Sequence, residues 1–566
     1  MNSDMDRPGM RHGRRIVTAL VVSLFSCAAF SVSPGLGSEA HIEQDLATRV
    51  AAGVTDVPVV ITLKAHADTD ARGRRPGDVV RALRATAAAT QGSVLDDLDG
   101  PSRRFWLVNA IATSVDAAEL ERLRDDPEVA SVALDARVAI AGTASGAGSG
   151  SWGVGAIGAP EVWSRYGLTG TGVRVGSIDT GVDATNPELV GAISAWKDFV
   201  GGRPSPYDDN GHGTHTVGTM VARNVTGAPV GVAPGATAVV AKAMGADGVA
   251  SGSNLLAAAQ WMTDPDGDPA TADFPTVINN SWTAAGADNE WFRPMVQAWV
   301  AMGIAPVFAV GNTAGTLGNP ASYPESIAVG QLNESGSVAA NSSNGVVSWT
   351  DAAGVTTQLS KPDLTAPGAL ISSTLGTGYG LYSGSSMASP HVAAAIALIR
   401  QARPDLTVDG VREILRSSAD DRGIPGFDLE YGAGALNVSA AISATGVPPL
   451  AVALPQATTP VAVANTAQDA AHTMIRVLKV TRRGGRLIVV GRVNGPGRLR
   501  LTLAPRTPTI QSDSSRTYRT ASRTGGRFSV SLPVRRAGRG RYVLVVAAVD
   551  NTGRRLGSTS RAVRIS

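Results

Sequence analysis

The sequence contains a single cysteine, Cys27, among its 566 residues. One cysteine cannot form a disulfide within the chain, and it excludes metal sites that need several thiolate ligands. Glycine (65) and proline (32) are not abundant enough for a low-complexity chain and show no Gly-X-Y period, which excludes a collagen. With 43% apolar and only 17% charged residues, the chain is typical of packed globular domains and not of a disordered protein.

Long hydrophobic runs are also missing, since no segment reaches 18 uninterrupted apolar residues. The nearest is residues 16–30, which follow four arginines in residues 7–15 and precede the small residues Ser38 and Ala40. A basic segment, a short apolar segment and small residues at a cleavage site are typical of a secretory signal. We predict that residues 1–40 are a signal peptide and that the mature protein is secreted without a membrane span. An uncleaved anchor, or a lipid on Cys27, remains an open alternative.

Acidic residues are scarce at the C-terminal end. Residues 447–566 carry 21 Lys/Arg and 3 Asp/Glu, whereas residues 152–446 carry 13 and 25. Such asymmetry indicates a basic unit with its own partner, which we expect to be an anionic cell-surface polymer. Docking on the acidic domain of the same chain, or a bias toward arginine (45 of the 50 basic residues), would also explain it. Only three aromatic residues occur there, which argues against nucleic-acid binding.

Two folded regions precede that basic end. Residues 41–140 combine strand-like runs (57–63, 105–108, 129–140) with helical spacing (78–98, 117–124), which predicts a small α/β domain. Residues 152–446 alternate buried strands (173–178, 238–241, 277–279, 305–310) with helices (253–262, 290–302, 388–401, 407–418). This alternation predicts an α/β domain with a parallel sheet flanked by helices.

The connecting segments have a different composition. Residues 141–151 are rich in Gly, Ala and Ser, which predicts a pliable, protease-accessible linker. Residues 447–472 are rich in Pro, Ala and Thr and are predicted to be a second linker. Residues 473–566 show short period-2 runs separated by turn residues, a pattern that predicts a small β-sandwich.

Three short segments of the predicted α/β domain carry the chemistry. Asp179 ends a buried strand, His212 stands between glycines before a helix, and Ser386 lies two residues after Gly384 at the start of another helix. Taken singly, each could be a helix cap, and His212 with His215 could bind a metal. Taken together, they supply a nucleophile, a base and a carboxylate that orients the base. The chain order Asp, His, Ser is the order of the subtilisin triad.

The motifs around these residues (IDTGV at 178–182, DDNGHGTH at 208–215, SGSSMASPHVA at 383–393) resemble those of the subtilases, the subtilisin-like serine peptidases. The segment VINNSW at 277–282 is similar to the bacillopeptidase F-like branch. The resemblance implies a subtilisin-like parallel sheet and a secreted serine endopeptidase that hydrolyses proteins or peptides through an acyl-enzyme. It also implies a self-processing zymogen, with residues 41–140 as its inhibitory propeptide.

The resemblance assigns roles to individual residues. Asp179, His212 and Ser386 match the charge relay, while Asn312 matches the oxyanion-hole asparagine and His215 a second, non-catalytic histidine. The segment that begins at Ser281 lines the substrate cleft in this family, and we assign substrate contacts to Ser281, Trp282 and Gly311. Thr283, Ala284 and Ala285 stand where glycines are usual, which leaves the depth of the first specificity pocket open.

One loop is a candidate for a metal site. Asp264, Asp266 and Asp268 place three carboxylates within five residues, and hard cations such as Ca²⁺ need clustered oxygen ligands. An EF-hand loop would need a glutamate at position 275, which is proline. We expect no required cofactor; a structural calcium ion and a solvated surface turn both remain open for this loop.

Other function classes fit less well. A serine esterase or lipase would need G-x-S-x-G with Asp and His after the serine, but Ser386 is followed by Met387 and Ala388. A relative that uses acidic residues in place of the histidine would not retain His212. The alternative that remains is a catalytically inactive subtilase-fold scaffold whose C-terminal domain binds a partner.

Overall fold

The structure is a computed structural model that describes residues 40–69, 75–147, 151–227, 229–350 and 354–450, together with strand segments between 474 and 565. The chain forms two compact units, residues 1–452 and 453–566, which are described separately. The predicted signal peptide, Cys27 and most of the predicted linker 447–472 lie outside the described residues.

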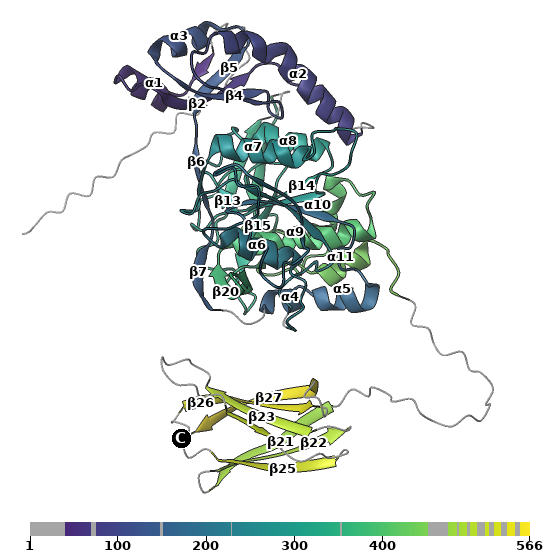
Figure 1. The fold of residues 1–566 in the computed structure, drawn as a ribbon. Coiled ribbons are helices and arrows are strands. Elements are labelled where there is room, and N and C mark those ends of the chain that lie inside the picture. The colour runs from purple at the N-terminus through teal and green to yellow at the C-terminus, as the bar shows by residue number, and fades with distance from the viewer. Residues whose placement is uncertain are drawn as a thin grey trace, which may run out of the picture. The chain divides into compact units, whose positions relative to one another are not determined.

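The first unit begins with a small α/β domain, drawn in purple in Figure 1. Its five-stranded sheet has the order β1-β5-β2-β4-β3 and lies against α1, α2 and α3. The elements are β1 His41–Ile42, α1 Gln44–Ala51, β2 Val57–Leu63, α2 Pro76–Asp96, β3 Arg103–Phe105, β4 Ala110–Val115, α3 Ala117–Asp125 and β5 Val129–Leu134. Helix α3 begins at a capping box in which Asp116 and Glu119 bond each other's backbone N–H groups.

One predicted strand of this domain is displaced. We expected a strand over residues 105–108, but β3 ends at Phe105 and the chain turns before β4. Asn109 takes a left-handed conformation with φ of 47°, and its side-chain amide donates to Ala65 O over 2.9 Å. The turn buries Phe105 and Leu107 without a regular strand, so hydrophobicity alone did not identify it.

Residues 152–446, called the catalytic domain below after its predicted role, contain a seven-stranded, fully parallel sheet of order β18-β15-β14-β12-β8-β10-β9. The strands are β8 Arg174–Asp179, β9 Ile193–Asp198, β10 Thr237–Lys242, β12 Val277–Asn280, β14 Ala305–Ala309, β15 Ile327–Leu332 and β18 Leu364–Pro367. Strands β12, β14 and β15 are buried along their whole length, as expected when helices cover both faces of a sheet. The predicted parallel α/β architecture is confirmed.

Two hydrophobic layers separate the sheet from its helices. Side chains alternate across the sheet: Ala238 and Val240 of β10 lie in one layer, Val239 and Ala241 in the other. One layer contains α5 Ala159–Tyr166, α6 His212–Val221, α9 Ser385–Ala402, α10 Val408–Ser417 and α11 Val438–Ala444. The other contains α7 Gly252–Thr263 and α8 Arg293–Ala301.

Smaller strands surround the sheet. Strand β6 (Arg137–Ile140) pairs with β11 (Val249–Ser251) and β13 (Trp282–Thr283), and β7 (Thr143–Ala147) joins β19 (Ile371–Leu375) and β20 (Gly378–Ser383). Strands β16 (Gly345–Thr350) and β17 (Thr356–Lys361) form a hairpin, and α4 spans Trp152–Ala156. Part of the linker that we expected to be pliable, residues 141–151, is thus a paired strand. Its backbone hydrogen bonds come from β20, which the composition of the segment cannot reveal.

The second unit consists of two antiparallel sheets (Figure 1). One has the order β21-β22-β25 and the other β24-β23-β26-β27. The strands are β21 Met474–Arg483, β22 Arg486–Asn494, β23 Arg498–Pro505, β24 Arg516–Arg519, β25 Gly526–Pro533, β26 Gly540–Val549 and β27 Arg555–Ile565. The period-2 pattern therefore identified an all-β unit.

Helix length bears on the question of a membrane span. Within the described parts of both units, none of the helices combines enough length and enough apolar character to cross a bilayer.

Candidate active site

The three predicted catalytic residues come together at one edge of the sheet. Asp179 is the last residue of β8, His212 the first of α6, and Ser386 the second of α9. All three side chains are buried. The carboxyl end of a central strand and the starts of two helices thus hold these groups on rigid elements, where ligands commonly bind in α/β folds.

The carboxylate of Asp179 fixes the orientation of the histidine ring. Its Oδ1 lies 2.8 Å from His212 Nδ1 and also accepts from the backbone N–H of Thr180 at 2.7 Å. Its Oδ2 accepts from the hydroxyl of Thr216 at 3.1 Å. An acceptor at Nδ1 places the proton on that nitrogen, which leaves Nε2 as the basic atom.

A second carboxylate, Asp208, supports the loop before His212. It accepts from the backbone N–H groups of Gly211 (2.8 Å) and Thr214 (2.8 Å) and from the hydroxyl of Thr180 (2.9 Å). Burial acts to raise the pKa of Asp208, but these hydrogen bonds hold it below its ordinary value. Sequence reasoning quoted Asp208 only as part of a motif and missed this positioning role.

Ser386 is directed away from the base in this structure. Its Oγ donates to Ser281 O at 2.8 Å, and His212 Nε2 has no hydrogen-bond partner among the residues that the structure describes. Attack on a carbonyl therefore requires Oγ to exchange its acceptor from Ser281 O to His212 Nε2. Catalytic hydrogen bonds often tighten only when the reaction begins.

Two donors converge on one carbonyl oxygen beside Ser386. The O atom of Ala141 accepts from Ser386 N at 3.1 Å and from Asn312 Nδ2 at 2.5 Å. The Oδ1 atom of Asn312 in turn accepts from Ser385 N at 2.9 Å, which orients the amide. The structure therefore brings Asn312 Nδ2 and Ser386 N, the two donors that the resemblance assigns to an oxyanion hole, to one carbonyl oxygen of the chain itself.

The residues before Ala141 are held as the middle strand of a three-stranded sheet. Strand β6 runs antiparallel to β11 on one side and to β13 on the other. The backbone N–H of Ala141 donates to Ser281 O at 3.1 Å, and Trp282 is paired with Ile140. Ser281 and Trp282 thus contact the bound strand through their backbones, as a peptide substrate would require.

The side chain of Trp282 has a different function. It is fully buried, and its ring centroid lies 5.4 Å from that of Phe292 and 5.4 Å from that of Phe308. Gly311, the third predicted substrate contact, has φ of 106°, and a Cβ there would lie 2.8 Å from Ser343 Oγ. Only glycine suits this position next to Asn312.

Gly142 lies directly against the catalytic base. A Cβ atom added to it would lie 3.0 Å from His212 Nε2 and 3.2 Å from Ser386 Cβ. Beyond it, β7 pairs with β20. The peptide bond between Ala141 and Gly142 therefore has its carbonyl oxygen on Asn312 Nδ2 and Ser386 N, and Gly142 next to His212. The composition of residues 141–151 predicted a protease-accessible linker and could not specify a bond within it.

Thr283 lies next to the segment that carries Asn312. A Cβ added to Gly318 would lie 3.0 Å from Thr283 Cβ, and one added to Gly311 would lie 3.8 Å from Thr283 Cγ2. The methyl group of Thr283 therefore occupies space beside Gly311 and Gly318. A glycine at position 283 would leave this space open.

The other two histidines of the motifs are structural. His215 Nε2 lies 2.9 Å from Ile371 O, and His391 Nδ1 lies 2.8 Å from Met387 O. Burial lowers the pKa of His215 to about 3 and that of His391 to about 4. Both rings are therefore neutral at ordinary pH.

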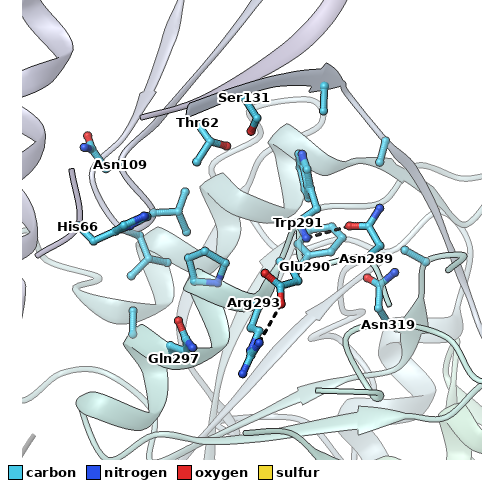
Figure 2. A pocket seen from close by; sticks show the side chains of 18 of the residues that line it. Thr62, His66, Asn109, Ser131, Asn289, Glu290, Trp291, Arg293, Gln297 and Asn319 are labelled. Atoms are coloured by element: carbon cyan, nitrogen blue, oxygen red, sulfur yellow. Dashed lines mark hydrogen bonds and ion pairs between the residues drawn. The ribbon is translucent and has the colours of Figure 1, made fainter. Parts of the chain in front are cut away.

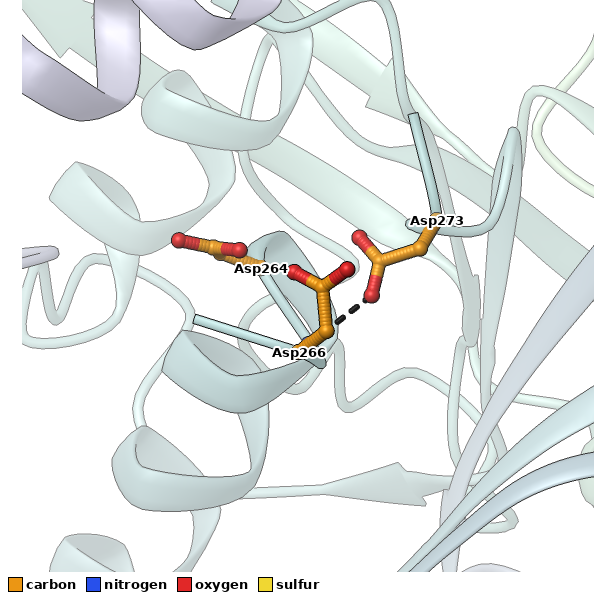
Figure 3. A group of neighbouring side chains, drawn as sticks. All are labelled: Asp264, Asp266 and Asp273. Carbon is orange, nitrogen blue, oxygen red and sulfur yellow. Dashed lines mark hydrogen bonds between the residues drawn. The ribbon is translucent and has the colours of Figure 1, made fainter. Parts of the chain in front are cut away.

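The acidic loop after α7 gathers a different set of carboxylates from the predicted one. Asp264 and Asp266 lie with Asp273, with one oxygen of each within 4.8 Å of the others (Figure 3). Asp268 is not part of this group, because its carboxylate caps the turn by accepting from Ala270 N at 2.9 Å. The chain then reverses and brings Asp273 back toward Asp266. The spacing of the acidic residues alone could not reveal this turn.

A cavity of about 920 Å³ lies between the N-terminal domain and the catalytic domain (Figure 2). His66 and Asn109 line it from one side, and Trp291, Arg293 and Gln297 from the other. None of the three catalytic residues lines it. The cavity therefore belongs to the interface between the two domains, while the catalytic cleft itself is filled by residues 137–147.

Comparisons with known proteins identify the family of this chain. A model of the subtilase family matches residues 170–434. Bacillopeptidase F of Bacillus subtilis (strain 168) is 35% identical over 417 residues, which cover 65% of this chain and 28% of the relative. Subtilisin E of the same organism is 34% identical over 367 residues, covering 63% and 87%. Alkaline elastase YaB of Bacillus sp. (strain YaB) is 32% identical over 339 residues, covering 60% and 80%.

The fold and the arrangement of Asp179, His212 and Ser386 define a serine-type hydrolase with a subtilisin-like sheet. The chain belongs to the subtilase family of serine-type peptidases, and the resemblance to the bacillopeptidase F-like branch is confirmed. It spans little more than a quarter of Bacillopeptidase F but most of Subtilisin E.

Proposed function

We propose that this protein is a secreted serine endopeptidase, made as a zymogen that cuts its own Ala141–Gly142 bond. The observation that carries the proposal is the carbonyl of Ala141, which accepts from both Asn312 Nδ2 and Ser386 N while Gly142 lies against His212. A peptide bond held in this way is a substrate at the start of acyl transfer.

The chemistry follows from the positions of these groups. Ser386 Oγ attacks the carbonyl carbon of Ala141 while His212 Nε2 takes the hydroxyl proton. The negative charge that develops on the carbonyl oxygen is stabilised by Asn312 Nδ2 and Ser386 N. His212 then gives the proton to the amine of Gly142, which leaves, and the acyl group stays on Ser386. Water, deprotonated by His212, releases the acyl group as a carboxylate.

Residues 41–140 act as the inhibitory propeptide in this proposal. Their contacts continue beyond the cleft: Asp135 accepts from Ser253 N at 2.8 Å and from Ser253 Oγ at 2.6 Å at the start of α7. Gln260 Oε1 accepts from Leu107 N at 3.1 Å. Because these contacts do not involve the bond that is cut, the propeptide would stay bound after cleavage and block the cleft with β6.

Secretion and the partner of the basic C-terminal unit also belong to the proposal. The relatives named above are subtilisins and related peptidases, and the N-terminal residues have the composition of a secretory signal. Outside the cell, 21 basic against 3 acidic residues in 447–566 would favour an anionic polymer, held by many weak charge contacts. The catalytic steps above use only groups of the chain, both side chains and the backbone N–H of Ser386, and a water molecule.

Labelling with a serine-reactive phosphonylating probe tests the proposal. We expect one probe per processed chain on Ser386, loss of casein hydrolysis on labelling, and highest activity at neutral to alkaline pH, because a protonated His212 cannot act as a base. A folded chain that neither reacts with the probe nor cleaves casein would support the alternative of an inactive binding scaffold. A maximum near pH 4 would point to a different base.

A further inference from the structure

One guanidinium of the propeptide covers the acidic loop of the catalytic domain. Arg84 on α2 donates from Nη2 to Asp264 Oδ2 and from Nη1 to Gly267 O at 3.1 Å. Its guanidinium also lies over the ring of Trp106, 4.9 Å from the centroid. The contact joins residues 180 positions apart in the chain, and Arg84 belongs to the segment that the proposed cut after Ala141 would separate from the catalytic chain.

Asp264 is an unfavourable place for a negative charge. It is the C-cap residue of α7, at the negative end of the helix dipole, and its side chain is only 3% exposed. Its Oδ1 accepts no hydrogen bond from any residue in the described ranges. A buried acceptor without a donor is costly, and a cation would satisfy it.

A second oxygen in the same place also lacks a donor. Asp273 Oδ1 is buried and unpartnered within the part of the chain that the structure describes, while Asp273 Oδ2 accepts from Asp266 N at 2.8 Å. Figure 3 shows one oxygen of Asp264 turned toward the carboxylate of Asp266, and Asp273 approaching from the other side. Carboxylate oxygens from three positions therefore converge on one point.

Departure of Arg84 would make more oxygens available. Asp264 Oδ2 and Gly267 O both accept from this guanidinium, so its departure would leave both oxygens without that donor. Without Arg84, three carboxylates would face each other with no cation from α2. Calcium takes six to eight oxygen ligands and accepts irregular geometry, so carboxylates, a carbonyl and water would form a suitable site.

We propose that Asp264, Asp266 and Asp273, with the carbonyl of Gly267, form a calcium site of the catalytic domain that Arg84 closes in the precursor. Calcium and the propeptide then compete, and each weakens the binding of the other by the same factor. The inference rests on the proposed processing only for the release of the propeptide, because competition between Arg84 and the ion operates in the uncut chain too.

Calorimetric titration with CaCl₂ tests the competition in the full-length chain that carries Ser386→Ala, which cannot cut itself. Replacing Arg84 by Gln should tighten calcium binding by about tenfold, within the usual range of coupling between sites. The matched control is Arg81→Gln on the same helix, which removes a surface ion pair with Asp78 and should leave calcium binding unchanged. Equal affinities with and without Arg84 would overturn the competition.

Two variants in the acidic loop test the calcium site itself. Their parent is the full-length chain that carries both Ser386→Ala and Arg84→Gln. Asp273→Asn retains an acceptor for Asp266 N but removes a charge, and we expect at least about tenfold weaker calcium binding. Asp268→Asn lies outside the carboxylate group and should bind calcium like its parent. Unchanged binding in Asp273→Asn would overturn the site; if that chain failed to fold by circular dichroism, Asp266→Asn would give the same test.

These titrations separate the two proposals. Because the chain with Ser386→Ala cannot cut itself, failure of the calcium site would leave self-cleavage untouched. Conversely, if the wild-type chain were cut at a bond other than Ala141–Gly142, the calcium affinities measured in the uncut chain would not change.

Discussion

The side-chain amide of Asn312 donates to the carbonyl oxygen of Ala141 over 2.5 Å, although the two residues are 171 positions apart. The same oxygen accepts from the backbone of the nucleophile Ser386. The donors are thus in place before any charge develops on the oxygen. This is electrostatic preorganisation, in which the fold has already oriented the dipoles that stabilise the transition state.

Replacing Asn312 by Ala should reduce turnover by about 10²–10³ with little change in KM, the effect seen when the equivalent donor is removed from subtilisin. The reason is that the amide contributes most when the oxygen is charged. Steady-state kinetics on a peptide substrate gives both constants, and the unfolding midpoint shows whether the fold is kept. An unchanged kcat would remove Asn312 from the oxyanion hole.

Thr283 should restrict the residue before the cleaved bond to small side chains. Its methyl group lies against Gly311 and Gly318, and the residue bound next to Asn312 in this structure is Ala141. Replacing Thr283 by Gly should raise kcat/KM for phenylalanine over alanine at that position by about 10–100-fold, since several apolar groups gain room. Paired peptides that differ only in that residue measure the ratio. If the ratio stays the same, Thr283 does not limit the pocket.

Acid should destabilise the catalytic domain through its buried histidines. Burial holds the pKa of His391 at about 4, below the ordinary value of about 6.5. Between these values the unfolded chain binds a proton that the folded chain does not, so stability is full above about pH 6.5 and falls as the pH drops toward 4. The slope is about 1.4 kcal/mol per pH unit for each such group.

Replacing His391 by Asn should therefore flatten the loss of stability between about pH 4.5 and 6, even if the variant is less stable at pH 7. Tryptophan fluorescence can follow denaturant unfolding in the Ser386→Ala chain. It reports on the first unit, which contains His391, because all nine tryptophans precede residue 350. A variant with the same pH slope as its parent would show that His391 is not the group responsible.

Deletion of residues 447–566 should leave turnover on small peptides nearly unchanged, because every catalytic residue precedes them. The full chain should bind an anionic matrix and elute by about 0.5 M salt, since charge contacts are screened over a few ångströms there. The deletion should abolish this binding. A truncated enzyme that binds equally well would discard the anchoring role, and an inactive one would make the tail part of the catalytic fold.

The positions of the three predicted catalytic residues follow from local sequence. Asp179 ends an apolar strand, His212 follows Gly211, and Ser386 lies two residues after Gly384 at the start of a helix, so their places at the edge of the sheet follow from the alternation of strands and helices. The parallel sheet follows in the same way, from apolar strands too continuous for a solvent-exposed face.

The features that depend on distant pairing were not predictable. The Ala141–Gly142 register is set by Ser281, Asn312 and Ser386, which lie more than a hundred residues away. Composition suggested a pliable linker there, because glycine, alanine and serine do not indicate which strand their backbone will join. Similarly, the place of Asp273 beside Asp266 depends on a turn, and that of Arg84 on the contact between two domains.

The central claim is that Asp179, His212 and Ser386 form a peptidase site that cuts the chain in which they lie. Intact mass and N-terminal sequence of the secreted protein test it most directly, for the wild type beside Ser386→Ala purified in the same way. We predict a wild-type catalytic chain that begins at Gly142, and a variant that keeps residues 41–141 joined to it, since loss of the nucleophile costs about 10⁶ in turnover in subtilisin. A Ser386→Ala chain that is cleaved after Ala141 without added protease would contradict the account.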